Sequence, residues 1–80
     1  MRERYKLNGL RKGETSEIVG YSIEDSVTRR LIVMGLSPGK EVFYVRNAPL
    51  RDPIQIKVGS TDLILRRSEA EKVFIKKPYK

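Results

Sequence analysis

The chain has 80 residues, of which 17 are lysine or arginine and 10 are acidic, so its formal net charge is +7. It contains no cysteine and no histidine, which excludes disulfides and thiolate metal sites and removes the side chain that most often performs acid–base catalysis near neutral pH. A chain of this length forms one small domain (residues 1–80) with little room for a catalytic pocket, so we expect a binding protein without catalytic residues or cofactor, not an enzyme.

The first regular elements predicted along the chain are a strand and a helix. The strand covers residues 17–21, around two apolar residues. Farther on, Val27, Leu31 and Met34 recur at i, i+4 and i+7. This is the spacing of one face of a helix, and it predicts an inserted α-helix over about residues 25–34.

The ends of this helix also have sequence signals. Asp25 or Ser22 can cap its start, because short polar side chains accept hydrogen bonds from the first backbone amides. Gly35 follows the last periodic residue and suits the left-handed position after a helix. Leu36 can then fold back onto Leu31, which is the apolar contact of a Schellman ending.

A tight turn and a strand are predicted next. In residues 37–40, proline at the second position (Pro38) and glycine at the third (Gly39) match a type II turn. Residues 41–46 are rich in β-branched and aromatic side chains, which predicts a strand. Both of its faces are apolar, so we expect it to be buried on both sides, as in a small barrel.

The remaining elements follow a loop that contains two prolines. Alternating apolar residues predict two strands joined by a Gly-Ser turn. Ser68 and Glu71 form a capping-box pattern over one helical turn, and a short apolar run predicts a last strand before a lysine-rich end. These segments are the loop 47–53, the strands 54–58 and 61–66, the helical turn near 68–72, the strand 73–75 and the basic tail 76–80.

The order of these elements predicts the fold class. About five short strands are separated by glycine, proline and polar turns, and only one helix of more than a single turn is inserted among them. This pattern favours a mostly β fold, a small closed barrel, over a two-layer α/β fold.

The location of the protein is predicted from its apolar runs and its first residues. The longest apolar runs, residues 31–34 and 42–45, have four residues each, whereas a membrane-spanning helix needs about 20. Residues 1–6 carry mixed charge with no apolar stretch behind them, unlike a secretory signal. Together with the absence of cysteine, these features predict a soluble, cytoplasmic protein.

Motifs for phosphate, metal and nucleic-acid binding are weak. The six glycines match neither a Walker nor a dinucleotide fingerprint, and the scattered acids lack EF-hand spacing, so no specific metal site is expected. A net charge of +7 is ordinary for a soluble small domain. Nucleic-acid binding needs exposed aromatic side chains among basic ones, but Phe43 and Tyr44 lie in the strand that we expect to be buried. The basic candidates near them are Arg46, Arg51, Lys57, Arg66 and Arg67.

Several short motifs occur together in a specific order. A run from Arg29 to Gly39 contains a basic pair, Met-Gly-Leu and Pro-Gly. It is followed by Ala48-Pro49, Asp52-Pro53-Ile54 and the run Leu-Arg-Arg-Ser-Glu-Ala from Leu65 to Ala70. This ordered set resembles the FeoA family of ferrous iron transport accessory proteins over essentially the whole chain.

The resemblance implies a fold, a compartment and a partner. The fold is an SH3-like barrel with an inserted helix, in the bacterial cytoplasm. The partner is the membrane ferrous iron transporter, which has a cytosolic GTP-binding domain. The family offers no catalytic residues to carry over, and the motif residues here have structural roles by the helix-ending and turn arguments above: Leu31, Met34, Gly35, Leu36, Pro38 and Gly39.

Two hypotheses follow for the function. In the first, the protein docks on the cytosolic part of the transporter through the helix pair Arg29 and Arg30 and the loop residues Leu50, Arg51 and Asp52, because loops and exposed helix faces on a rigid scaffold commonly carry binding. An adjacent basic pair is otherwise a solvated helix face. In the second, the chain is a stand-alone module related to the carboxy-terminal domain of iron-dependent repressors, and it binds another protein or nucleic acid.

Overall fold

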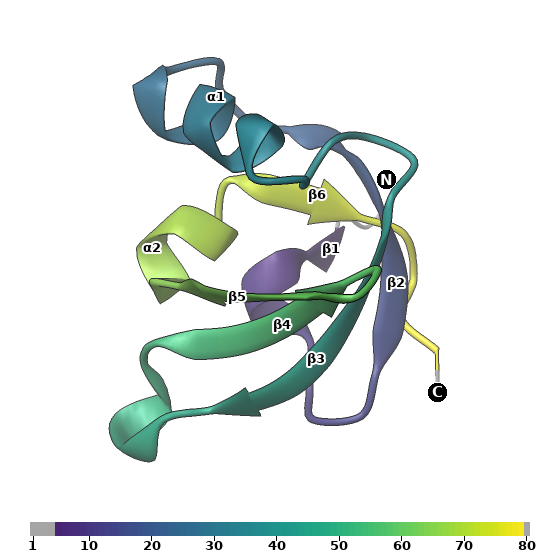
Figure 1. Ribbon diagram of the computed structural model, residues 1–80, viewed down its shortest axis with the longest axis vertical. Coiled ribbons are helices and arrows are strands. Elements are labelled where there is room, and N and C mark those ends of the chain that lie inside the picture. The colour runs from purple at the N-terminus through teal and green to yellow at the C-terminus, as the bar shows by residue number, and fades with distance from the viewer. Residues whose placement is uncertain (1–4, 80) are drawn as a thin grey trace.

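The backbone forms one six-stranded antiparallel sheet that curls around a central core in the computed structural model (Figure 1). The structure describes residues 5–79, so residues 1–4 and 80 of the predicted domain lie outside the described residues. The strand order is β1-β6-β2-β3-β4-β5. The strands are β1 (Tyr5–Lys6), β2 (Thr15–Tyr21), β3 (Glu41–Asn47), β4 (Ile54–Val58), β5 (Thr61–Leu65) and β6 (Val73–Ile75), and the helical segments are η1 (Leu7–Gly9), α1 (Ser26–Val33), η2 (Pro49–Arg51) and α2 (Arg67–Ala70).

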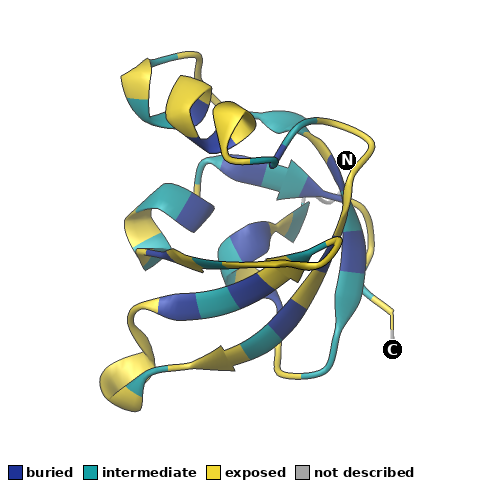
Figure 2. Cartoon of the chain, viewed as in Figure 1, coloured by how far each residue is buried: buried dark blue, intermediate teal, exposed yellow. Residues whose placement is uncertain are grey.

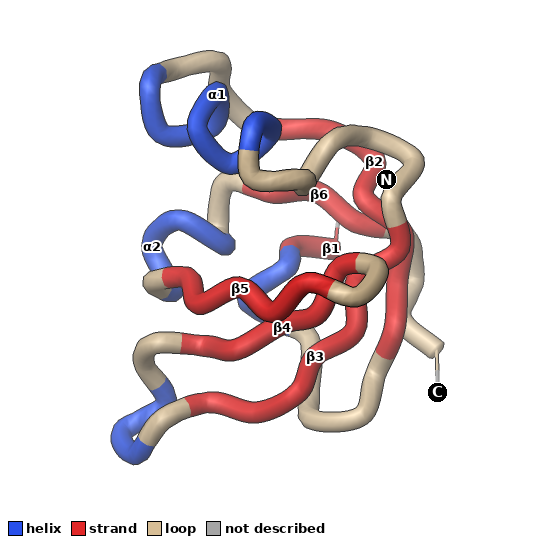
Figure 3. Tube along the Cα trace, in the orientation of Figure 1, coloured by secondary structure: helices blue, strands red, loops and turns tan. Residues whose placement is uncertain are grey.

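The sheet bends at two irregularities in its ladders. One lies between β2 and β6 at residues 18–20, and the other lies between β3 and β4 at residues 44–46. A bulge places two residues opposite one, which bends the strand and increases its twist. These bends let one continuous sheet wrap around its own apolar face (Figure 3).

The core is built from alternate residues of the strands (Figure 2). In β3, Val42 and Tyr44 are buried, but Phe43 between them is 40% exposed. The prediction that this strand is buried on both faces is therefore wrong, because no second layer within residues 5–79 covers the outer face of the sheet at Phe43. The buried apolar residues are Leu7, Leu10, Ile18, Leu31, Leu36, Val42, Tyr44, Ile54, Ile56, Leu65, Ala70, Val73 and Ile75.

The inserted helix α1 packs on the core through a narrower stripe than its sequence suggested. Thr28 and Leu31 are buried and Val27 is partly buried, whereas Met34 is 37% exposed. Met34 lies one residue past the last helical turn, at the C-cap, so it sits at the rim of the packed face instead of in it. The helix bounds otherwise agree with the predicted 25–34 once the two cap residues are included.

The end of α1 has the Schellman geometry expected from Gly35. The Leu36 amide donates to the Leu31 carbonyl and the Gly35 amide donates to the Ile32 carbonyl, both at 3.0 Å. Gly35 has a φ of 116°, which side chains rarely allow. The Tyr21 hydroxyl donates to the Leu36 carbonyl, and burial raises the pKa of Tyr21 to about 12, so this donor keeps its proton.

The start of α1 is held by a carboxylate. Asp25 Oδ1 accepts from the Thr28 amide at 2.9 Å, and the Asp25 amide donates to Thr28 Oγ1 at 2.9 Å. Lys72 Nζ, which lies just before β6, donates to Asp25 Oδ2 at 2.9 Å. Asp25 therefore both caps α1 and ties it to the segment that leads into β6.

Two details near the chain ends differ from the sequence-based expectation. The predicted helical turn near 68–72 is α2, which starts one residue earlier and ends two residues earlier, and its cap joins the Arg66 amide to Glu69 Oε1 at 3.0 Å instead of using Ser68 and Glu71. No contact was predicted for the basic tail 76–80, but the Tyr79 amide donates to the Thr15 carbonyl at 2.8 Å and Ser16 Oγ donates to the Lys76 carbonyl at 2.6 Å. Within residues 5–79, no helix is long and apolar enough to cross a bilayer.

Replacing Gly35 by alanine tests the helix ending. We expect Gly35→Ala to lower the free energy of unfolding by about 1–2 kcal/mol, because a Cβ is strained at this φ. Gly20→Ala is the matched control, because Gly20 has no positive φ and its Cβ would meet nothing within 4 Å. Urea unfolding of both variants gives the comparison, and equal effects would contradict the assigned role of Gly35.

Asp25 predicts a pH dependence of stability. Hydrogen bonds from the Thr28 amide and from Lys72 lower the pKa of Asp25 from 3.8 to about 2. The folded state thus favours the carboxylate, so its contribution is present above the unfolded pKa of 3.8 and is lost as the pH falls toward 2. In thermal unfolding scans from pH 6 to about pH 2, Asp25→Asn should lose less stability on acidification than the unmodified protein. If both proteins lose the same stability on acidification, groups other than Asp25 cause that loss.

Candidate partner-binding site

The loop between β3 and β4 holds an apolar side chain out in solvent. Leu50 is 96% exposed and has a φ of 69°, and Arg51 has a φ of 70°. Neither residue is a glycine, and consecutive left-handed residues of this kind are kept only where their surroundings enforce them. The loop is closed on itself: the Arg51 amide donates to the Ala48 carbonyl at 2.8 Å, and the Ala48 amide donates to the Pro53 carbonyl at 2.9 Å.

One arginine fixes this loop to the body of the protein. The Arg67 guanidinium donates to the Arg51 carbonyl through Nε, to the Asn8 carbonyl through Nη1 at 2.7 Å and to the Tyr44 hydroxyl through Nη2 at 3.3 Å. The Arg67 amide donates to Asp52 Oδ1 at 3.1 Å. The planar guanidinium has five donors in a fixed fork, so it can hold several acceptors in one geometry. Arg67, a candidate for nucleic-acid contact by sequence, is therefore engaged inside the fold.

A second ionic contact joins the two helices. Arg30 on α1 forms an ion pair with Glu69 on α2, and the second carboxylate oxygen of Glu69 caps the Arg66 amide. The side chain of Arg30 is 58% exposed and that of Glu69 is 18% exposed. Exposed ion pairs contribute little to stability, so this contact mainly orients the Arg30 guanidinium.

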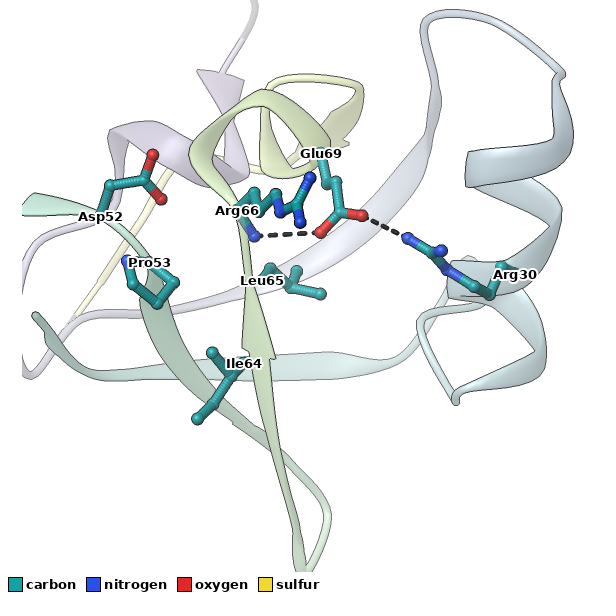
Figure 4. A pocket seen from close by; sticks show the side chains of 7 residues that line it. All are labelled: Arg30, Asp52, Pro53, Ile64, Leu65, Arg66 and Glu69. Atoms are coloured by element: carbon teal, nitrogen blue, oxygen red, sulfur yellow. Dashed lines mark hydrogen bonds and ion pairs between the residues drawn. The ribbon is translucent and has the colours of Figure 1, made fainter.

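Between these contacts lies a surface hollow of about 610 Å³ (Figure 4). Arg30 and Glu69 stand on one side of it, and Asp52 and Pro53 stand on the other, with β5 running between them. Ile64 on β5 is 64% exposed. The hollow thus combines an apolar strip with charged groups at its margins, which suits binding of a partner. Its lining residues are Arg30, Asp52, Pro53, Ile64, Leu65, Arg66 and Glu69.

The structure brings some of the predicted contact residues together. Arg30 and Asp52, which are 22 positions apart, line the same hollow. Leu50 and Arg51 lie on the adjoining loop, and Arg29 is exposed on α1 beside Arg30 without lining the hollow. In Figure 1, α1, α2 and η2 lie along one side of the molecule, with α1 at its top and η2 at its bottom, and both ends of the chain lie on the other side.

Sequence reasoning missed three contributors to this surface. Ile64 could have been found as the outward apolar residue of an alternating strand, and Glu69 as the residue three positions after Arg66. No local signal marks Arg67, since its acceptors lie up to 59 residues away. Among residues 5–79, no group of three or more histidine, cysteine, aspartate or glutamate side chains is arranged to hold a metal ion.

Replacing Arg67 by lysine tests whether its guanidinium group holds the loop in place. Arg67→Lys keeps the charge but leaves carbonyl acceptors without partners, so we expect a loss of about 1–3 kcal/mol in the free energy of unfolding. Backbone relaxation at Leu50 should show faster motion than in the unmodified protein. Arg66→Lys is the control and should change stability by less than about 0.5 kcal/mol. Unchanged backbone relaxation at Leu50 in Arg67→Lys would contradict the role assigned to the Arg67 guanidinium.

Known proteins share both the sequence pattern and the fold. The family model of the FeoA domain matches residues 5–77. A fusion of Fe(2+) transport protein A with the Fe(2+) transporter FeoB from Porphyromonas gingivalis is 32% identical over 68 residues, which are 85% of this chain and 8% of that protein. The chain therefore spans a small part of this curated relative.

Solved structures agree with the family match. The FeoA protein of Chlorobium tepidum is 37% identical with a TM-score of 0.82, over 89% of this chain and 68% of that one. The zinc-complexed FeoA of Stenotrophomonas maltophilia, described as an SH3 domain protein, is 29% identical with a TM-score of 0.79, over 90% and 89%. A manganese-dependent transcriptional repressor shares the fold alone, at 17% identity and a TM-score of 0.80, over 94% and 42%. The predicted SH3-like fold is confirmed.

Proposed function

The chain belongs to the FeoA domain family, and we propose that it is a cytoplasmic accessory protein of bacterial ferrous iron uptake that docks on the cytosolic part of the GTP-binding ferrous iron transporter. The observation that carries this proposal is the fusion protein of Porphyromonas gingivalis, in which a domain similar to this chain is joined to an Fe(2+) transporter. Joining two domains in one polypeptide raises their effective concentration, which benefits domains that act on each other.

The surface proposed for docking is the side that carries α1, α2 and the 48–53 loop. Its most exposed apolar side chain belongs to Leu50, whose loop backbone is held by hydrogen bonds within the loop and by Arg67. A loop whose backbone is already ordered loses less conformational freedom on binding than a flexible one. Burial of a leucine side chain contributes about 1.5–3 kcal/mol, which is the scale of an interface hot spot.

Basic and acidic groups lie on the same side of the molecule as this anchor. Arg51 and Asp52 follow Leu50 directly on the loop, and Arg29 and Arg30 are exposed on α1, at the far end of that side (Figure 1). Charges at the rim of an interface mainly speed association and fix the register of binding. In this proposal Leu50 supplies affinity, while the charged residues select the orientation on the transporter.

The mode of action proposed is binding, which adjusts assembly or activity of the transporter. The alternative, a module that binds nucleic acid or an unrelated protein, has only a fold likeness to a repressor behind it. It is distinguished in the same assay, since nucleic-acid binding by a basic surface weakens steeply as salt increases.

Binding to the purified full-length transporter in detergent tests the proposal. We expect Leu50→Ser to raise the Kd roughly 10- to 100-fold, and Arg29→Glu to raise it by a smaller factor with a slower association rate. Lys12→Glu is the control, because Lys12 is an exposed residue in the turn before β2 and does not line the hollow.

The unmodified protein must bind the transporter for the proposal to stand. Binding that is equal in Leu50→Ser and Lys12→Glu would refute the assigned surface. No binding to the transporter, together with salt-sensitive binding to a DNA duplex, would refute the function and favour the alternative.

A further inference from the structure

The strand β5 ends the sheet with an uncovered backbone edge. It pairs with β4 along its whole length, from Ile54↔Leu65 to Val58↔Thr61. No strand lies on its other side within residues 5–79. Exposed edges of this length are a ready template for another strand, and proteins normally cover or shorten them. The opposite edge strand, β1, has two residues in the part of the chain that the structure describes.

The geometry of the hairpin identifies the free groups. Gly59 and Ser60 form a two-residue turn, which makes Val58 and Thr61 a hydrogen-bonded pair. Pairs alternate along an antiparallel ladder, so Asp62 and Ile64 direct their amides and carbonyls away from β4. Among residues 5–79, none of these four groups takes part in the turn, loop or side-chain hydrogen bonds of the fold.

Hollows lie at both ends of this edge. The hollow of about 610 Å³ described above contains Ile64 and Leu65, and Arg30 of α1 faces them across it (Figure 4). A second hollow, of about 430 Å³, is lined by Thr61 at the start of β5 and by Met34 at the end of α1. A segment lying along β5 would therefore meet an opposing wall from α1 and could place side chains into both hollows.

The charges around the edge indicate what such a segment carries. Three acidic lining residues already accept hydrogen bonds within the chain: Glu41 from the Tyr79 hydroxyl, Asp52 from the Arg67 amide, and Glu69 from Arg66 and Arg30.

On the strand itself, Asp62 stands opposite Lys57 in the ladder, so these two charges offset each other. Lys40 in the second hollow and Arg66 in the first have no ion pair among the described residues. A carboxylate at each end of the segment would complement them.

The same charges disfavour a second copy of the chain as the occupant. Each copy carries a net charge of +7, and pairing β5 with β5 would bring two such molecules into contact along their edges. Self-repulsion of this size opposes association. A partner segment with acidic ends and an apolar middle can cover Ile64. Its backbone would pair with the free amides and carbonyls of β5, and its carboxylates would pair with Lys40 and Arg66.

We propose that β5 is a docking edge to which an extended segment of the partner, with acidic ends and an apolar centre, adds as a further antiparallel strand beside α1. The inference rests on the proposed function in taking that segment from the cytosolic part of the transporter. Strand addition obtains affinity from main-chain hydrogen bonds and specificity from the pockets that alternate side chains enter.

Removing one outward amide tests the strand addition. Ile64→Pro deletes this donor, and the fold should tolerate it because the amide faces solvent on an edge strand. Ile64→Thr is the matched control, since it keeps the amide and the β-branched shape. We expect Ile64→Pro to raise the Kd for the full-length transporter in detergent at least about 10-fold over Ile64→Thr. Equal Kd values for the two variants would overturn the proposal.

Hydrogen exchange on the unmodified protein gives a second readout that does not depend on the folding of a variant. Bound to the transporter, the Asp62 and Ile64 amides should exchange at least roughly 10-fold more slowly than in the free chain. If the transporter binds but these two amides exchange as before, the docking edge is refuted and the proposed function stands. If the transporter does not bind at all, both are refuted.

Discussion

The Arg67 guanidinium is the interaction on which the proposed binding surface depends. It joins carbonyl groups of η1 and of the 48–53 loop to the hydroxyl of Tyr44 in β3, so three segments far apart in the sequence are held by one side chain. The sheet ends in two strands, β1 and β5, that do not pair with each other, and α2 with η1 lies where they would meet (Figure 1). This fork adds to the hydrogen bonds within the loop in maintaining the left-handed backbone at Leu50.

A second set of polar contacts fixes the position of α1 relative to the segments that Arg67 joins. Asp25 caps the helix and receives Lys72, while Arg30 reaches Glu69 on α2. The apolar contribution comes from Leu31 and Leu36, both fully buried. The short helix is thus fixed at its start by charge, at its centre by packing and at its end by the Gly35 turn. Because its position is fixed, α1 faces the uncovered edge of β5. Arg29 and Arg30 therefore stay on the same side of the molecule as Leu50.

Much of the fold could be predicted from the sequence because its signals are local. The features that were missed depend on contacts between segments far apart in the chain. The Schellman ending at Gly35 and the β4–β5 hairpin are encoded by residues a few positions apart, and both have the expected bounds within a residue. The short strand β1 and the pairing of Tyr79 with Thr15 depend on segments that meet only in the folded chain. For the candidate site, the loop predicted at 47–53 was found because its prolines exclude a strand, although Asn47 still belongs to β3. The role of Arg67 was not, because an arginine that reaches solvent and one that holds distant backbone carbonyls look alike in sequence.

Photo-crosslinking in intact cells shows whether this surface contacts the ferrous iron transporter. A photoreactive phenylalanine analogue replaces Leu50 in one variant and Lys12 in another. The account predicts a crosslinked product that contains the transporter from position 50 and none from position 12, since Leu50 is the exposed tip of the loop that Arg67 holds in place. Crosslinks to the transporter from position 12 alone, or crosslinks from position 50 only to nucleic acid or unrelated proteins, would contradict it.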